Sequence, residues 1–274
     1  MLTYCMVKSL YSTRTLDDEI AKDALSAISK LERSSLSRNC YALTGGFGVQ
    51  SYLPTSCRRP SEDIDLIIGV PLDFKSFALF IKPVKEHLID EGYKVKSKLV
   101  KFGYNLFVVD DDKSEGMVIE FLRINQNSFN NMRHILEREL RNCKRKTVEG
   151  KSDVFSVLSP EDLIAPKLLR VMGTLKKYPD LVTDLAYFRN LGGDRGLKEK
   201  LTYVKNLRDL DKPNSFFREK MKFFSDVFDI RILYEVAGFN MDYLKKAIGD
   251  WNLYGTKSTE FMTVTSNILP GLFY

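Results

Sequence analysis

The character of the sequence changes near residue 158, and this change limits the folds open to the chain. Before it, short apolar runs typical of strands alternate with amphipathic segments typical of helices. After it, helical patterns follow one another and few strand-like runs remain. We therefore expect an α+β protein with a mixed-sheet domain over 1–157 and a helical domain over 158–274. The helical patterns of the second part cover 160–175, 179–190, 194–207, 214–236 and 240–250.

The first part predicts a mixed sheet with flanking helices. Its expected order is helix, strand, helix, strand, helix and then further strands, and Pro83 should interrupt or kink the third helix. The expected helices cover 16–33, 47–53 and 73–92, and the expected strands cover 40–44, 63–70, 93–99, 103–110 and 117–124.

Composition excludes several classes of protein. No apolar run reaches the roughly 18–20 residues that a membrane helix needs, and the first residues lack the order of a signal peptide. We therefore expect a cytoplasmic protein with no membrane partner. The four cysteines form no C-x-x-C pair and there are two histidines, which argues against a zinc site or a disulfide scaffold.

Two aspartates in the expected strand over 63–70 suggest a metal site. Alternation puts Asp63 and Asp65 on one face of that strand and the apolar residues Ile64 and Leu66 on the other. Neighbouring carboxylates repel each other when both are ionised. A hard cation with oxygen ligands relieves this repulsion, and magnesium is the common choice.

A glycine pair precedes these aspartates in the sequence. Gly45 and Gly46 lie between an expected strand and an expected helix, where a tight turn lets backbone N–H groups approach a phosphate. Either motif alone is weak, since a solvated strand end or an ordinary turn explains it. Together, with one helix between them, they suggest phosphoryl or nucleotidyl transfer.

These residues resemble a known signature. Gly45-Gly46, a helix and then Asp63-Ile64-Asp65-Leu66 match the pattern of the DNA polymerase β-like nucleotidyltransferase superfamily. The fuller pattern adds Thr44, Arg59 and Ser61, and is similar to the AbiEii/AbiGii-type branch, which includes toxins of abortive-infection and MenT-type toxin–antitoxin systems. In the second part, 158–167 (LSPEDLIAPK) resembles that family's LSPEELLAxK segment, and Asp184-Leu185 resembles its D-x-x-D-L segment.

The resemblance covers about residues 40–190 and implies a nucleotidyltransferase-fold sheet followed by a helical domain that contributes to the site. It implies magnesium, with two ions expected, and an NTP as substrate. The implied roles are metal binding by Asp63 and Asp65, nucleotide binding by Thr44, Gly45, Gly46, Arg59 and Ser61, triphosphate contact by Lys167, and completion of the site by Asp184.

Three positions leave alternatives open. Pro166 disfavours helix just before Lys167, which leaves the direction of the lysine unsettled. Asp180 and Asp184 lie four residues apart where the family usually shows three, and the neighbouring Leu185 favours Asp184. Glu120 is a candidate third metal ligand, although a lone strand glutamate more often faces solvent.

The acceptor and the partners follow only from the resemblance and from charge. The net charge is +6, and the basic run over 133–146 suits either a solvated helix face or contact with an RNA. By family analogy the acceptor is the 3′ end of a tRNA, with a small molecule or a protein hydroxyl as alternatives, and a cognate antitoxin is a possible partner. Two other functions compete: an inactive nucleotide-binding protein of the same fold, and a basic nucleic-acid-binding module.

Overall fold

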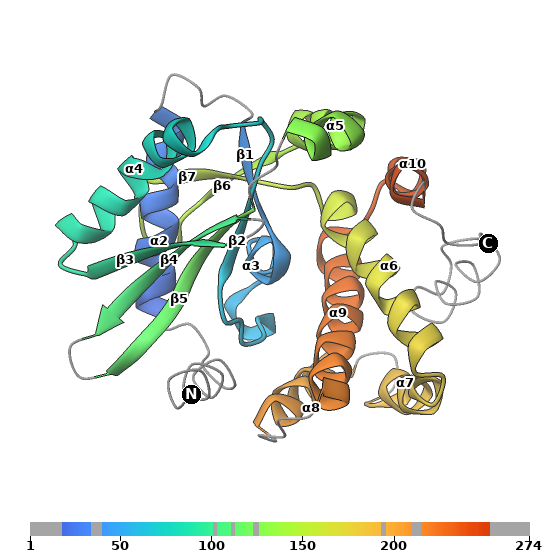
Figure 1. The fold of residues 1–274 in the computed structure, drawn as a ribbon. Coiled ribbons are helices and arrows are strands. Elements are labelled where there is room, and N and C mark those ends of the chain that lie inside the picture. The colour runs from blue at the N-terminus through green and yellow to red at the C-terminus, as the bar shows by residue number, and fades with distance from the viewer. Residues whose placement is uncertain are drawn as a thin grey trace, which may run out of the picture. The chain divides into compact units, whose positions relative to one another are not determined.

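The protein is described by a computed structural model whose chain divides into two units (Figure 1). The first unit contains Met1–Ser51 and Pro60–Ser159, and the second contains Tyr52–Arg59 and Pro160–Tyr274. The sequence places its boundary two residues before Pro160 and does not separate the short segment 52–59 from the first domain. The described residues are 18–33, 40–100, 103–110, 113–122, 126–192, 196–209 and 215–252.

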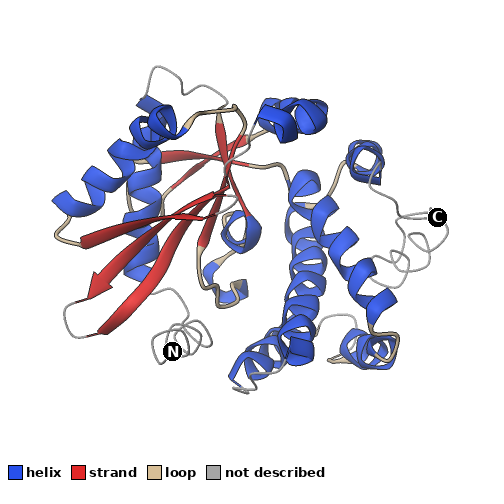
Figure 2. Cartoon of the chain, viewed as in Figure 1, coloured by secondary structure: helices blue, strands red, loops and turns tan. Residues whose placement is uncertain are grey.

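A seven-stranded mixed sheet forms the centre of the first unit, in the order β3-β4-β5-β2-β1-β7-β6 (Figure 2). Parallel pairs join β2 to β5 and β1 to β7, and the remaining neighbours are antiparallel. This mixed sheet with flanking helices confirms the expected fold class. The strands are β1 (Tyr41–Thr44), β2 (Ile64–Ile68), β3 (Lys94–Val100), β4 (Gly103–Asp110), β5 (Lys113–Leu122), β6 (Lys144–Thr147) and β7 (Val154–Val157).

The sequence did not predict strands β6 and β7. Strand β6 consists of Lys144, Arg145, Lys146 and Thr147, so it has no apolar alternation to reveal it. It is an edge strand, and charged residues there protect the sheet from pairing with another chain. Strand β7 is only four residues long, and Phe155 and Val157 within it are buried.

Helices α2 (Asp18–Ser29) and α4 (Phe74–Asp90) pack on one face of the sheet. The ring of Phe77 in α4 meets the ring of Phe121 in β5 edge to face, with centroids 6.1 Å apart. Strand β2 alternates accordingly, with Ile64, Leu66 and Ile68 buried in the core. Pro83 lies inside α4, so the expected interruption of this helix is wrong. The first unit also contains η1 (Lys30–Arg33), α3 (Gly45–Gln50) and α5 (Gln126–Arg141).

Five helices and one short 3-10 turn make up the described part of the second unit. Its core is aromatic: Phe188, Phe223 and Phe224 are buried and contact one another or Tyr203, with ring centroids 5.0–5.4 Å apart. The elements are η2 (Thr55–Cys57), α6 (Pro160–Lys177), α7 (Leu181–Asn190), α8 (Leu197–Asp209), α9 (Ser215–Ala237) and α10 (Met241–Asn252).

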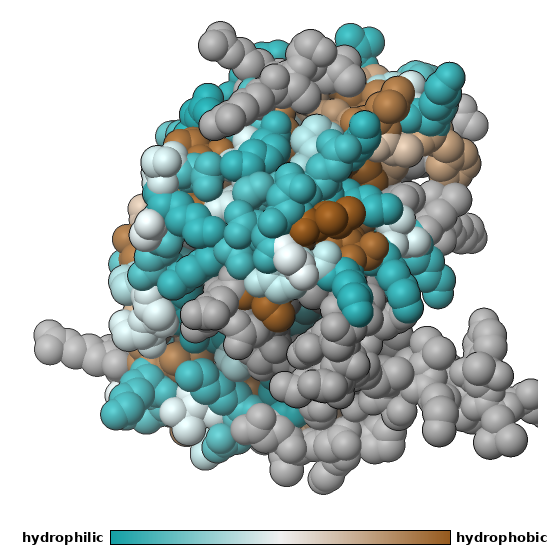
Figure 3. Space-filling view, turned by 90° about the vertical axis from the view of Figure 1, so that its left-hand side faces the viewer, coloured by the Kyte–Doolittle hydropathy of each residue, from teal (hydrophilic) through white to brown (hydrophobic). Residues whose placement is uncertain are grey.

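The side of the molecule shown in Figure 3 is mostly hydrophilic where residues are described, with hydrophobic areas that are small and separate. Among the described helices, none combines the length and the apolar character needed to cross a bilayer.

Candidate active site

Three carboxylates meet on one face of the sheet in the first unit. Asp65 of β2 lies directly opposite Glu120 of β5 in the parallel register, and Asp63 comes two residues before Asp65. Paired residues on neighbouring strands project to the same side, so the register itself brings Asp65 and Glu120 together. Each of the three residues offers a carboxylate oxygen within 4.8 Å of the others, and all three are half-buried.

Glycine at position 45 is required by this carboxylate cluster. Strand β1 pairs with β2 so that Thr44 lies opposite Asp65, and Gly45 follows with a φ of +64°. A Cβ atom at Gly45 would lie 1.8 Å from Oδ2 of Asp65, which no real contact permits. The backbone of Gly45 thus touches a carboxylate of the cluster, and only glycine satisfies both the positive φ and the close approach.

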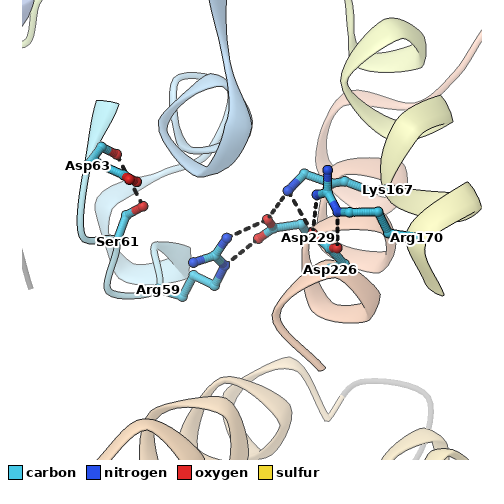
Figure 4. A network of polar contacts seen from close by, with 7 residues as sticks. All are labelled: Arg59, Ser61, Asp63, Lys167, Arg170, Asp226 and Asp229. Atoms are coloured by element: carbon cyan, nitrogen blue, oxygen red, sulfur yellow. Dashed lines mark hydrogen bonds and ion pairs between the residues drawn. The ribbon is translucent and has the colours of Figure 1, made fainter. Parts of the chain in front are cut away.

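Ser61 lies just before the cluster. It is buried, and its hydroxyl donates a long hydrogen bond of 3.5 Å to the backbone carbonyl oxygen of Asp63 (Figure 4). This contact stabilises the chain where it enters β2. The geometry therefore gives Ser61 a local structural contact, and its predicted contact with a nucleotide remains a prediction.

In the second unit, Lys167 forms the centre of a buried ionic network (Figure 4). Its Nζ lies 3.0 Å from Oδ1 of Asp226 and 2.9 Å from Oδ2 of Asp229, and the residue is 3% exposed. Arg59 donates two hydrogen bonds of 2.7 Å to Asp229, and Arg170 donates two of 2.9 Å to Asp226. The three cations therefore enclose the two carboxylates.

Asp226 is strongly stabilised in its ionised form. Burial by itself would raise the pKa of its carboxyl, but the charges of Lys167 and Arg170 and the hydrogen bonds from both residues outweigh burial and lower the pKa to about 2. The network is thus ionic at neutral pH.

Lys167 is not paired with the acid that the sequence favoured. Asp184 of α7 accepts a hydrogen bond of 2.6 Å from Lys220, and Asp180 directly precedes α7. Helix α6 continues through Pro166, so the expected break before Lys167 is wrong. Asp226 and Asp229 were not among the residues predicted for the site, although both stand in the apolar stretch FFSDVFDI, where charged residues are unusual unless they are paired.

Three of the six cations in the basic run over 133–146 form described ion pairs. Arg133 pairs with Glu137 at 2.6 Å, and Arg145 lies 3.1 Å from Glu32. Arg138 is 8% exposed and lies 3.6 Å from Glu139. Of the cations in this run, Arg141 and Lys144 are the exposed ones for which no ion pair is described. The run is therefore a weaker candidate for RNA contact than its charge suggests.

The LSPED segment at the start of α6 has a structural role. Glu161 accepts a hydrogen bond of 2.7 Å from the backbone N–H of Asn240, and Asp162 accepts one of 2.7 Å from the hydroxyl of Tyr243. Both bonds attach the beginning of α10 to α6. These hydrogen bonds give Glu161 and Asp162 a role that does not require contact with a substrate.

The comparisons with known proteins find similar solved structures. No protein-family model matches the chain, and no curated protein sequence matches it. Among solved structures, it is similar to an antigenic nucleotidyltransferase-like protein from Paracoccidioides brasiliensis, with a TM-score of 0.40 and 14% identity over 93% of this chain and 94% of that one. It is also similar to MenT4, a nucleotidyltransferase toxin of Mycobacterium tuberculosis H37Rv, with a TM-score of 0.35 and 13% identity over 92% of each chain.

These two neighbours are nucleotidyltransferase-like proteins. A third neighbour is the cyclic AMP-GMP synthase DncV of Vibrio cholerae in complex with a linear intermediate, with a TM-score of 0.21 and 14% identity over 95% of this chain and 82% of that one. One of these neighbours, MenT4, is a toxin of the class that the motifs resemble. Since every TM-score lies below 0.5, we take the function from the residues of the chain itself.

Proposed function

We propose that the chain is a magnesium-dependent nucleotidyltransferase. It would transfer a nucleoside monophosphate from an NTP to a hydroxyl of an acceptor and release pyrophosphate. The observation that carries this proposal is the cluster of Asp63, Asp65 and Glu120, whose carboxylate oxygens lie within 4.8 Å of one another. Three like charges at this separation repel each other, and a divalent cation is the partner that removes the repulsion.

The donor set fits magnesium. All three side chains offer oxygen atoms, which magnesium prefers, and no histidine or cysteine belongs to the described cluster. Asp63, Asp65 and Glu120 would hold the metal, with two ions expected from the family resemblance. When bound, magnesium would neutralise phosphate charge and favour ionisation of the attacking hydroxyl.

The residues around the cluster have proposed roles of their own. A side chain at position 45 would displace the Asp65 carboxylate, so glycine there keeps Asp65 in place in the cluster. The backbone N–H groups of Gly45 and Gly46, with Thr44, would bind the phosphates. Arg59, Lys167 and Asp184 keep their predicted roles toward the nucleotide as proposals.

The acceptor and the biological role are proposed from the family resemblance. We propose RNA as the acceptor, with the 3′ end of a tRNA as the first choice and exposed Arg141 and Lys144 as candidate phosphate contacts. A toxin with this activity would be paired with an antitoxin protein.

Transfer of a labelled nucleotide tests the proposal. The full-length protein is incubated with each α-labelled NTP, magnesium and total tRNA, beside Asp63→Asn and the control Asp90→Asn, which alters an exposed acid of α4. We expect labelled RNA with the wild type and with Asp90→Asn, but not with Asp63→Asn or after chelation of the metal.

Other outcomes redirect or reject the proposal. Label on the protein or on an added small molecule would keep the nucleotidyltransferase and replace the acceptor. NTP binding without transfer to any acceptor would point to the inactive nucleotide-binding alternative. Equal transfer by the wild type and Asp63→Asn would show that these carboxylates are not the active site.

A further inference from the structure

Exposed apolar side chains gather at one end of the second unit. Among its described residues, four large apolar side chains are strongly exposed, and three of these lie in α7 or at the start of α9. Val182 is 55% exposed, Tyr187 58% and Phe216 40%. Single exposed apolar side chains are ordinary, whereas several that lie together mark a surface for binding.

Each of the two exposed aromatic rings is held in place by a tyrosine. Phe216 contacts Tyr178, with ring centroids 4.9 Å apart, and Tyr187 contacts Tyr203, with ring centroids 6.1 Å apart. Contact with a neighbouring ring restricts the side-chain conformations of Phe216 and Tyr187. A planar ligand can therefore stack on either ring with little further loss of side-chain freedom.

An ion pair joins the helix turns that carry these rings. Nζ of Lys220 in α9 lies 2.6 Å from Oδ2 of Asp184 in α7. Phe216 comes four residues before Lys220, and Tyr187 comes three residues after Asp184, so each ring lies on the same side of its helix as the ion pair. The two rings therefore belong to one surface, formed by α7 and the start of α9, which we call the α7–α9 surface (Figure 1).

Cations outnumber acids in the segments that form this surface. Residues 176–190 and 215–222 contain six lysines and arginines and three acids. Asp184 is paired with Lys220, Glu219 is paired with Lys177 at 2.5 Å, and the third acid, Asp180, is exposed. The other four cations are exposed, and none of them has an ion pair with another described residue: Lys176, Arg189, Arg218 and Lys222. The surface therefore combines aromatic rings with cations, which suits a polyanion that also presents planar groups.

We propose that the α7–α9 surface binds single-stranded RNA, whose bases stack on Tyr187 and Phe216 while its phosphates meet the exposed cations. Every base has a flat face that can stack on an aromatic ring, so this mode of binding needs no particular sequence. In a duplex these faces are covered by neighbouring bases, so a single strand is the form that fits. The rings and cations point to a single-stranded nucleic acid independently of the carboxylate cluster, whereas the choice of RNA, as the acceptor, rests on the proposed function.

Binding of a single-stranded RNA to the full-length protein tests this inference. A fluorescent RNA of about 12 nucleotides is titrated and followed by anisotropy, with EDTA present so that the carboxylates of the first unit cannot contribute through a metal. We expect Tyr187→Leu to weaken binding about tenfold because stacking is lost, and Tyr187→Phe, which keeps the ring, to bind as the wild type does. Equal binding by Tyr187→Leu and the wild type, or tighter binding of a duplex, would overturn the inference.

The salt dependence of the same titration tests the phosphate contacts. We expect Arg218→Gln to lower the slope of log Kd against log salt by about 0.7, the value for one phosphate contact on a single strand. Lys246→Gln is the matched control, because Lys246 is an exposed cation of α10 outside the α7–α9 surface, and its slope should equal that of the wild type. Equal slopes for Arg218→Gln and the wild type would contradict the proposed phosphate contacts.

A measurement on the wild type keeps the test valid if a variant folds poorly. RNA that contains 5-iodouridine forms cross-links on irradiation to aromatic rings that stack on the base, and mass spectrometry locates them. We expect cross-links at Tyr187 or Phe216. Cross-links confined to the first unit, such as the basic run over 133–146, would contradict the proposal.

Two further outcomes would assign the surface to another ligand. If no RNA binds and the protein sediments as a dimer that Tyr187→Leu disrupts, the surface belongs to a second copy of the chain and the inference is overturned. Tighter binding of DNA of the same sequence would overturn the choice of RNA. Because binding requires no turnover, loss of transfer with RNA binding intact counts against the proposed enzyme alone, and the reverse counts against this inference alone.

Discussion

The two units concentrate charge in opposite ways. In the first unit, strands β2 and β5 bring three carboxylates within 4.8 Å of one another. In the second, helices α6 and α9 and the segment before Pro60 bring three cations around two carboxylates. A single ion pair elsewhere in the chain, such as that between Lys151 and Asp23 at 2.8 Å, joins one cation to one acid. In the second unit opposite charges lie together, whereas in the first unit a bound cation would complete the carboxylate cluster.

The two clusters also differ in what holds them. The acids of the first unit are fixed by strand register, so a one-residue slip would move Asp65 to the other face of the sheet. The acids of the second unit are fixed by their cations. Substitutions in the first cluster should therefore affect activity with little loss of stability, and substitutions in the second should affect stability strongly.

The largest effect is expected for the first cluster. Asp65→Asn should lower the rate of nucleotide transfer by roughly 1,000-fold or more. The reason is that the three carboxylates act together, so removing one of them removes most of their joint contribution to the rate. The free energy of unfolding should change little, since the amide has nearly the same shape and removes a repulsive charge. Single-turnover kinetics and urea unfolding measure the two quantities. A variant with wild-type transfer would remove Asp65 from the site.

Gly45→Ala tests the close contact with Asp65. The new methyl group would displace the carboxylate, so transfer should fall by about 100-fold, as for other displaced catalytic groups. Gly150→Ala is the matched control, because Gly150 has a φ of +77° and nothing within 4 Å of its would-be Cβ. Both variants should lose roughly 1–2 kcal/mol of stability from left-handed strain, but transfer should fall in Gly45→Ala alone. Equal activity of the two would mean that the approach to Asp65 is unimportant.

The partners of Lys167 can be distinguished by stability. Asp229→Asn breaks a buried network and should reduce the free energy of unfolding by about 3–5 kcal/mol. Asp184→Asn breaks a partly exposed pair with Lys220 and should cost less than about 1 kcal/mol. Urea unfolding of the two variants makes the comparison. If Asp184→Asn instead abolished transfer while remaining stable, the acid favoured by the sequence would be the functional one.

A pH-dependent effect is expected for the second cluster. The pKa of Asp226 is about 2 in the folded protein, against 3.8 as the ordinary value. Its contribution is therefore fully present above the unfolded pKa and is lost as the pH falls through the interval between these values, with a total on the order of 2 kcal/mol. The difference in unfolding free energy between the wild type and Asp226→Asn should narrow by this amount between pH 5 and pH 2. A difference that stays constant with pH would show that Asp226 is not ionised in the network.

Much of the first unit could be predicted from local patterns. Alternation in 63–70 correctly separated Asp63 and Asp65 from Ile64 and Leu66, which are buried, and the family resemblance made Glu120 a candidate third ligand. The pairing of Asp65 with Glu120 depends on the strand order, which a single sequence does not reveal. Strand β6 was not predicted because its residues are mostly lysine and arginine, and an edge strand needs no apolar alternation.

The second unit was harder to predict because its network joins distant parts of the chain. Arg59 and Asp229 lie 170 residues apart, and Lys167 and Asp226 lie 59 apart. The short D-x-x-D-L similarity directed attention to Asp184, whereas helix packing selects partners through the register of α6 and α9. The sequence signal for this network was the presence of two acids in an apolar helix. Burying an ionised carboxylate without a partner costs too much free energy, so such acids indicate cationic partners.

Metal binding is the most direct test of the central claim that Asp63, Asp65 and Glu120 form a divalent-cation site. Manganese replaces magnesium as a paramagnetic probe, and the free ion is counted by electron paramagnetic resonance in wild type, Glu120→Gln and Asp90→Asn. We predict saturable binding of one or two ions by the wild type and by Asp90→Asn, with Glu120→Gln weakened by about tenfold or more. Wild-type protein that leaves manganese free in solution, or equal binding by Glu120→Gln, would contradict the account.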